Sequence, residues 1–169
     1  TLTAGEKVKL RAKGVDAYGN RFPISPQWFL SASLGTIDPK TSEFMPLHVG
    51  SGEILAKVEN IVQGVDIRVA PAKLARLEVK PPTLDIIAGK TVQFKVTGYD
   101  QFGNEVDVEP HFSIVEPLGE IDPSGTFTAK KSGSTVIKAE ARGLVGQSTV
   151  AVIPAEMKKV QLSPQGPTK

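Results

Sequence analysis

The stretch AGKTVQFKVTGYDQFGN, residues 88–104, decides the fold, because a second copy, AGEKVKLRAKGVDAYGN, occupies residues 4–20. At this offset of 84 positions, 13 of 37 paired residues are identical, counted from Thr3–Pro39. An offset of 83 continues the match and pairs Phe44 with Phe127. Self-similarity at one fixed period is typical of repeated structural units. The chain is therefore predicted to contain a tandem repeat.

The repeat phase divides the chain into three segments. Residues 1–71 are expected to form a first repeat that lacks its opening strand, and residues 72–154 a second, complete repeat. Residues 155–169, which contain MKKVQLSP, match the start of the second repeat and are expected to be the opening strand or linker of a third. Either the chain is cut from a longer array, or this C-terminal stub pairs with another chain by strand exchange.

Hydrophobic residues alternate with polar ones throughout both repeats. Val8, Leu10 and Ala12 alternate with charged residues, and the segment Val65–Val69 shows the same period of two. Alternation places one face of a strand on a core and the other in water, and no segment shows a helical stripe. Turn signals separate about seven such strands in each repeat. The prediction is an all-β protein with two tandem β-sandwiches.

Composition removes several classes of chemistry. The 169 residues include 20 basic and 18 acidic side chains, without a block of like charge that would indicate nucleic-acid binding. No apolar run approaches the length of a membrane-spanning helix. Cysteine is absent, which excludes thiol catalysis, thiolate metal sites and disulfides. Glycine and proline, 16 and 13 residues, favour short strands with frequent turns.

The second repeat resembles the bacterial immunoglobulin-like domains of group 2. The resemblance rests on VQFKVTGYDQFGN, PHFSI and LGEIDPSGTFTAKKSGSTVIKAEA in that order. The matching motif positions are Gly119, Ile121, Asp122, Gly125, Phe127, Thr128, Ala129, Gly133, Ile137 and Ala139. The first repeat departs from the motif, because KTSEFMPLHVGSG replaces SGTFTAKKSGS. The resemblance implies two Greek-key immunoglobulin-like sandwiches, extracellular or on the bacterial cell surface.

One aromatic residue stands at the middle strand of each repeat. Trp28 in PQWFL and Phe112 in PHFSI occupy the same repeat position, where a ring would fill the space between two sheets. Leu30 and Ile114 share their parity, which favours burial. The alternative is an exposed aromatic residue that binds a ligand.

The repeated motif D-x-x-G-N suggests either a site or a turn. Two copies at one register, each between two strands, favour a structural turn. The expected turn residues are Asp16, Gly19, Asn20, Asp100, Gly103 and Asn104. The glycines and asparagines are expected to supply positive φ, and the aspartates to accept hydrogen bonds from backbone N–H groups.

Residues for catalysis or for metal binding are sparse. The two histidines, His48 and His111, lie at unrelated repeat positions, and no nucleophile or zinc motif is present. Glu105, Asp107 and Glu109 share a strand face and suggest a weak calcium patch, but a solvated face is the simpler interpretation. Asp38 and Asp122 each precede proline, which is typical of a β-turn, with metal binding as the alternative. The chain is therefore expected to be no enzyme and to need no cofactor.

These patterns favour a non-catalytic spacer and adhesion-type segment of a larger bacterial cell-surface or S-layer protein. The alternative is a carbohydrate-binding or accessory module of a secreted enzyme that acts on polysaccharides. The aromatic candidates for such a contact are Tyr18, Phe22, Tyr99 and Phe102. Expected partners are neighbouring repeats and surface glycans or proteins, not nucleic acid and not the membrane interior. Short linkers with proline predict a semi-rigid connection between the repeats.

Overall fold

The computed structural model describes residues 1–163 and 166, and all regular structure in it is β. The prediction of an all-β fold with two tandem immunoglobulin-like sandwiches is confirmed. The described residues contain no helix long and apolar enough to cross a membrane.

The first repeat forms nine strands among the described residues. They are β1 (Leu2–Thr3), β2 (Val8–Lys9), β3 (Lys13–Val15), β4 (Arg21–Pro23), β5 (Gln27–Leu30), β6 (Gly35–Asp38), β7 (Glu43–Pro46), β8 (Gly50–Val58) and β9 (Ile61–Ala70).

The second repeat forms ten. They are β10 (Leu74–Lys80), β11 (Thr83–Ile87), β12 (Thr91–Gln93), β13 (Lys95–Asp100), β14 (Glu105–Val106), β15 (His111–Ile114), β16 (Gly119–Ile121), β17 (Thr126–Ala129), β18 (Gly133–Ala141) and β19 (Leu144–Ile153).

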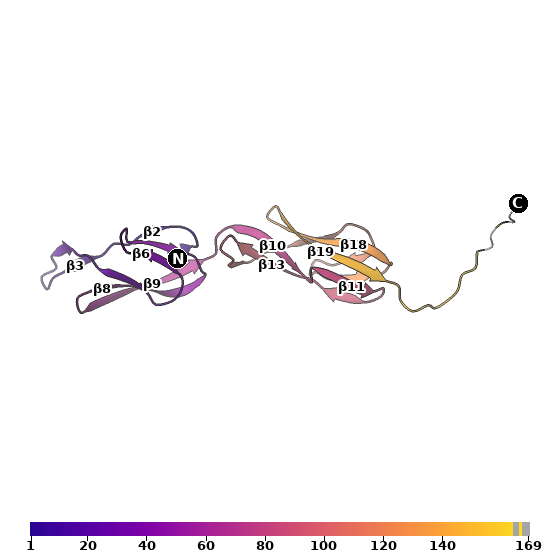
Figure 1. Cartoon of the computed structure of the whole chain (residues 1–169), viewed down its shortest axis with the longest axis horizontal. Coiled ribbons are helices and arrows are strands. Elements are labelled where there is room, and N and C mark those ends of the chain that lie inside the picture. The colour runs from indigo at the N-terminus through magenta and orange to yellow at the C-terminus, as the bar shows by residue number, and fades with distance from the viewer. Residues whose placement is uncertain (164–165, 167–169) are drawn as a thin grey trace. The chain divides into compact units, whose positions relative to one another are not determined.

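The strands form matching sheets in the two repeats. The four-stranded sheets have the orders β1-β9-β8-β5 and β11-β19-β18-β15, and β2-β7-β6 corresponds to β12-β17-β16. Figure 1 shows β11 beside β19, with β18 next to it. The registers coincide at the repeat offsets, since Trp28 lies opposite Ala56 and Phe112 opposite Ala139. The remaining sheets differ, because β3-β4 has two strands whereas β10-β13-β14 has three.

Spatial contacts divide the chain into two compact units. The first unit contains Thr1–Leu77 together with Thr97–Val108, and the second contains Glu78–Val96 and Glu109–Lys169. The first unit thus includes a segment of the second repeat, and this segment carries the second copy of the D-x-x-G-N turn. The predicted boundaries at 71/72 and 154/155 describe the sequence period and remain a prediction.

Each unit has its own apolar core around a phenylalanine that is fully buried. Phe44 in the first unit and Phe127 in the second are both 0% exposed. Phe44 packs with Ile54 and Val69, and Leu34 and Ala4 complete the first core. The second core is larger. It contains Val79, Ile86, Phe94, Phe127, Ala129, Ile137, Ala139, Val150 and Val152.

Three local expectations differ from the structure. Long predicted strands divide into shorter segments, for example at Phe94, which lies between β12 and β13 and donates its N–H to Gly125 O at 2.8 Å. Val65, expected on the core face, is 58% exposed because no described strand covers it. Residues 154–163 form no strand, and the rest of the predicted C-terminal segment, residues 164–165 and 167–169, lies outside the described residues.

Candidate functional site

The two D-x-x-G-N copies form the same turn. In the first turn, Asp16–Asn20, the Asp16 carboxylate accepts hydrogen bonds from the N–H groups of Tyr18 and Asn20 at 2.9 and 2.8 Å. In the second turn, Asp100–Asn104, Asp100 accepts the equivalent bonds, both at 2.9 Å. Gly19 and Gly103, at φ 86° and 85°, adopt the left-handed conformation that favours glycine.

The asparagines have a different role from the predicted one. Asn20 and Asn104 are not among the residues with positive φ, so that expectation is wrong. Each side chain instead donates from Nδ2 to the aspartate of its own turn, at 2.8 Å in the first and 2.9 Å in the second. The aspartate and asparagine side chains thus close the turn together.

Among the described residues, the second turn makes further hydrogen bonds within the first unit and the first turn does not. Nδ2 of Asn104 donates to the carbonyl of Leu47 at 2.8 Å, and Oδ1 of Asn104 accepts the N–H of Val49 at 3.1 Å. Oδ2 of Asp100 accepts the N–H of Ala72 at 2.9 Å. The second turn is therefore attached both to the loop 47–49 and to the segment that precedes β10.

An aromatic contact accompanies these hydrogen bonds. Phe102 packs against the apolar core of the first unit, and a Cβ atom added at Gly5 would meet its ring at 2.7 Å. Gly5 therefore has to be glycine for the ring to approach. Tyr18, at the same position of the first turn, is 92% exposed. One turn is docked and the other is free of such packing, although their internal geometry is the same.

Burial and hydrogen bonding act in opposite directions on Asp100. The side chain is 2% exposed, and this burial is the largest single influence and favours the neutral acid. The bonds from Asn104, Ala72 and Phe102 together outweigh it and lower the pKa of Asp100 below its ordinary value of 3.8. The pKa of Asp16 is lowered as well, chiefly by the Asn20 side chain. Both turns are therefore held by carboxylates that stay ionised.

The other two candidate contact aromatics lie within strands, Tyr99 in β13 and Phe22 in β4. Tyr99 carries the guanidinium of Arg76 over its ring, 4.1 Å from the centroid, which is a cation–π contact. Phe22 is 47% exposed, and its ring covers Gly14, where an added Cβ atom would meet it at 2.4 Å. The four predicted aromatics therefore form no continuous exposed row, since Tyr99 and Phe102 are engaged in contacts.

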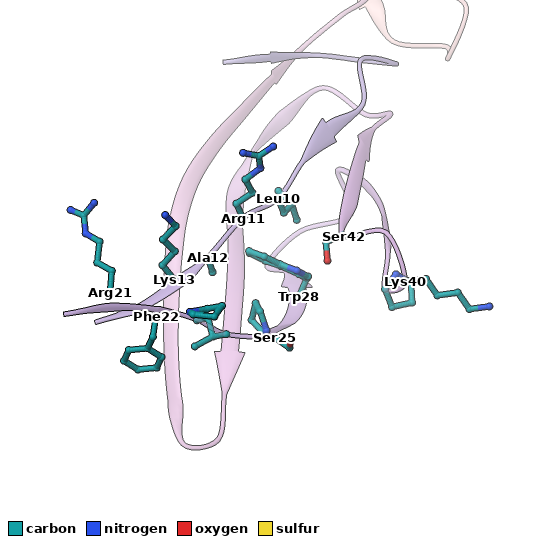
Figure 2. Close-up of a pocket in the computed structure, with 14 residues that line it drawn as sticks. Leu10, Arg11, Ala12, Lys13, Arg21, Phe22, Ser25, Trp28, Lys40 and Ser42 are labelled. Atoms are coloured by element: carbon teal, nitrogen blue, oxygen red, sulfur yellow. The ribbon is translucent and has the colours of Figure 1, made fainter. Parts of the chain in front are cut away.

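Trp28 and Phe112, the predicted core aromatics, are both half-buried and pack against the cores of their units. Trp28 also borders a hollow of about 550 Å³ that Figure 2 shows. Arg11, Lys13 and Arg21 extend together on one side of this hollow, while the Phe22 ring extends on the other. Nε1 of Trp28 is buried and has no hydrogen-bond partner within the described part of the chain.

The remaining polar candidates form turns or lie on the surface. Asp38 accepts the N–H of Lys40 at 2.8 Å, and Asp122 accepts the N–H of Ser124 at 2.9 Å, as in the predicted β-turns. His48 and His111 are exposed, as are Glu105, Asp107 and Glu109. Within residues 1–163, no group of three or more acidic or histidine side chains is placed to hold a metal ion.

Comparisons with known proteins give one weak relative and several structures. No protein-family model matches the chain. Ice-binding protein 1 of Shewanella frigidimarina (strain NCIMB 400) is 22% identical over 173 residues, which is 99% of this chain and 19% of that protein. The chain thus spans a small part of that relative's length.

Among solved structures, InvD of Yersinia pseudotuberculosis is 18% identical, with a TM-score of 0.51 over 94% of this chain and 54% of that chain. Domains 4 and 5 of the S-layer protein SbsC are 20% identical, with a TM-score of 0.45 over 86% of this chain and 81% of that chain. The likeness to InvD concerns the fold.

Hydrogen exchange tests the attachment of the second turn. Replacing Asn104 by alanine removes the acceptor of the Val49 N–H, so exchange of this amide should accelerate about fivefold, the value of one net hydrogen bond. The matched variant Asn20→Ala should leave the exchange of Val49 unchanged. Equal exchange of Val49 in the parent and in Asn104→Ala would show that the turn is not attached to the loop.

Acid titration tests the ionised state of Asp100. A group whose pKa is lowered by folding contributes stability above its unfolded pKa, and this contribution disappears as the pH falls through the folded value. The free energy of unfolding, measured by urea denaturation, should therefore decline below about pH 5 and decline less in Asp100→Asn. The Asp100 carboxyl carbon, followed by NMR in the folded protein, should titrate below 3.8. A midpoint above that value would contradict the account.

Proposed function

We propose that the chain is a non-catalytic structural spacer from a larger bacterial surface protein, built to keep its shape under tension. The observation that carries the proposal is the pairing of the first and last strands of the second four-stranded sheet. β11 lies parallel to β19, with five residue pairs from Thr83 opposite Thr149 to Ile87 opposite Ile153.

Parallel pairing of these two strands resists pulling along the chain. Tension on the chain draws β11 toward its N-terminal side and β19 toward its C-terminal side, so the strands are sheared along their length. All ladder hydrogen bonds then carry the force together, whereas an antiparallel hairpin pulled from its open end would break them one at a time. The first unit has the same arrangement with a shorter ladder, in which only Leu2 and Thr3 pair with β9.

The docked second turn supports the same function. A spacer under tension has to keep each segment of a repeat in the unit to which it belongs. The bonds of Asp100 to Ala72 and of Asn104 to Leu47 and Val49, with Phe102 on Gly5, fix the start of the second repeat onto the first unit.

The group 2 immunoglobulin-like assignment and the extracellular location belong to this proposal. Both rest on the resemblance of the second repeat, whose motif residues have clear structural roles. Phe127, Ala129, Ile137 and Ala139 are each 0% exposed, and Gly125 adopts φ 89°. Adhesion would be a property of the larger protein.

A carbohydrate-binding module is less well supported. Such a module presents exposed aromatic rings in a row, and of the four candidates only Tyr18 and Phe22 are exposed. Phe102 is packed on the core of the first unit, and Tyr99 lies under Arg76.

Single-molecule pulling tests the spacer proposal. Stretching the chain from its ends should give two separate unfolding events, and the event of the second unit should require about twice the force of the first, because five residue pairs share the load instead of two. Gradual extension without distinct events, or equal forces for both units, would contradict the proposal.

A disulfide assigns the events. The chain has no cysteine, and Asp85 lies opposite Ala151 in the β11–β19 register, so the double variant Asp85→Cys, Ala151→Cys introduces a unique cross-link. Under oxidising conditions the high-force event should disappear, and reduction should restore it.

A further inference from the structure

Each element that connects the first repeat to the second is present twice in the chain, but only one copy of each is in contact. The second turn is docked, and the first turn is not. Likewise, strand β10 is paired with β13, whereas the segment 157–163, one repeat period later, is exposed and unpaired with any described strand.

An open groove lies along β3. In the second repeat, β13 has β14 on one side and β10 on the other, but β3 pairs with β4 alone among the described strands. Between β3 and β9 lies a hollow of about 680 Å³, here called the β3 groove, which Val15, Phe22, Trp28 and Ile61 help to line.

Exposure at equivalent repeat positions shows what a strand in the β3 groove would cover. Inward-facing residues beside the groove are exposed, and their counterparts beside β10 are covered. An outward-facing pair, Val62 and Val145, is 55% exposed in both repeats and so acts as an internal control. The contrasting pairs are Val65 at 58% with Ser148 at 1%, Phe22 at 47% with Val106 at 8%, and Ile61 at 73% with Leu144 half-buried.

The segment Met157–Ser163 has the side chains to fill the groove. It lies 83 positions after Leu74–Lys80, which is β10, and its apolar residues Met157, Val160 and Leu162 correspond to Leu74, Leu77 and Val79. In the second repeat Leu74 packs over Gly98, and Val79 belongs to the buried core. Met157, Val160 and Leu162 are 80%, 71% and 88% exposed.

A second receiving surface for a turn is also present. The surface under Phe102 contains Gly5, whose N–H donates to Pro46 O at 2.7 Å, and one repeat later Gly89 donates to Ala129 O at 2.8 Å. The loop that follows is 130–132, equivalent to 47–49. A Cβ atom added at Gly89 would meet nothing within 4 Å, so this surface has the same backbone geometry without a ring on it.

We propose that two pairs of surfaces join one copy of the chain to the next. The segment Met157–Ser163 pairs with the β3 groove, and the first turn pairs with the surface at Gly89 and the loop 130–132. Met157–Ser163 of one copy adds as a strand to β3 of the next, in the place that β10 takes on β13. The first turn of the next copy then docks beside Gly89 and the loop 130–132, as the second turn docks beside Gly5. The two contacting surfaces are different, so the contact is heterologous and generates either closed rings or open chains of copies. This inference does not depend on the spacer proposal.

One residue opposes the contact. The Phe22 ring lies over Gly14, the place that Leu74 takes over Gly98, so Met157 can enter only when the ring swings away. The second repeat carries valine, Val106, at the position of Phe22. Association should therefore be weak in the parent chain and stronger in Phe22→Val.

Sedimentation equilibrium on the full chain, from about 10 µM to about 1 mM, tests the proposal. The average mass should rise with concentration above that of a single chain. Leu162→Asp should weaken association at least tenfold, Tyr18→Ala about tenfold, and Phe22→Val should strengthen it several-fold. Val145→Asp is the matched control, because it makes the same apolar-to-acidic change at an exposed residue outside both surfaces, and it should have no effect.

A competition experiment identifies the occupant of the groove. A synthetic peptide with the sequence of residues 155–163 should bind a chain truncated after Pro154 and should dissociate the assemblies of the full chain. Circular dichroism of each variant checks that it is folded. A monomer at all concentrations in both the parent and Phe22→Val would overturn the proposal, as would an association that Leu162→Asp leaves unchanged.

Discussion

The attachment of the second turn to the first unit depends on one buried carboxylate. Asp100 is 2% exposed and accepts four N–H donors, from Phe102, from Asn104 twice and from Ala72. Burying an ionised group costs free energy unless hydrogen bonds replace its water. The four donors provide this replacement, and they come both from the turn and from the segment before β10. The turn can therefore leave its place only if the bond between Asp100 and Ala72 is broken.

The two copies of the D-x-x-G-N motif show that forming the turn and docking it have different requirements. Asp16 and Asp100 make the same bonds inside their turns, yet Tyr18 is 92% exposed while Phe102 packs on a core. Glycine and the Asp–Asn pair are sufficient for the turn. Docking further requires Gly5, which leaves room for the Phe102 ring. It also requires the Leu47 carbonyl and the Val49 N–H, which form hydrogen bonds with Asn104. A repeated sequence can therefore carry a structural role and a contact surface in the same residues.

Period and turn chemistry were enough to predict the fold, because both depend on neighbours in the sequence. The alternation predicted the strands, and the equivalence of Phe44 and Phe127 holds in two separate cores. Side-chain roles that depend on distant residues were not predictable in this way. Val65 alternates like a core residue, but its burial requires a strand that does not pair with β3 among the described residues. The attachment of Asn104 to Leu47 spans 57 residues and leaves no local pattern.

NMR distance measurements test the central claim, that the second turn is held on the first unit whereas the first turn is not held in this way. Nuclear Overhauser effects should connect the ring protons of Phe102 with the α protons of Gly5, because the ring carbons lie against this glycine. At a concentration where the chain is monomeric, no corresponding effect should connect Tyr18 with Gly89. If Phe102 shows no contact with Gly5, and its ring behaves like the exposed ring of Tyr18, the second turn is not held on the first unit.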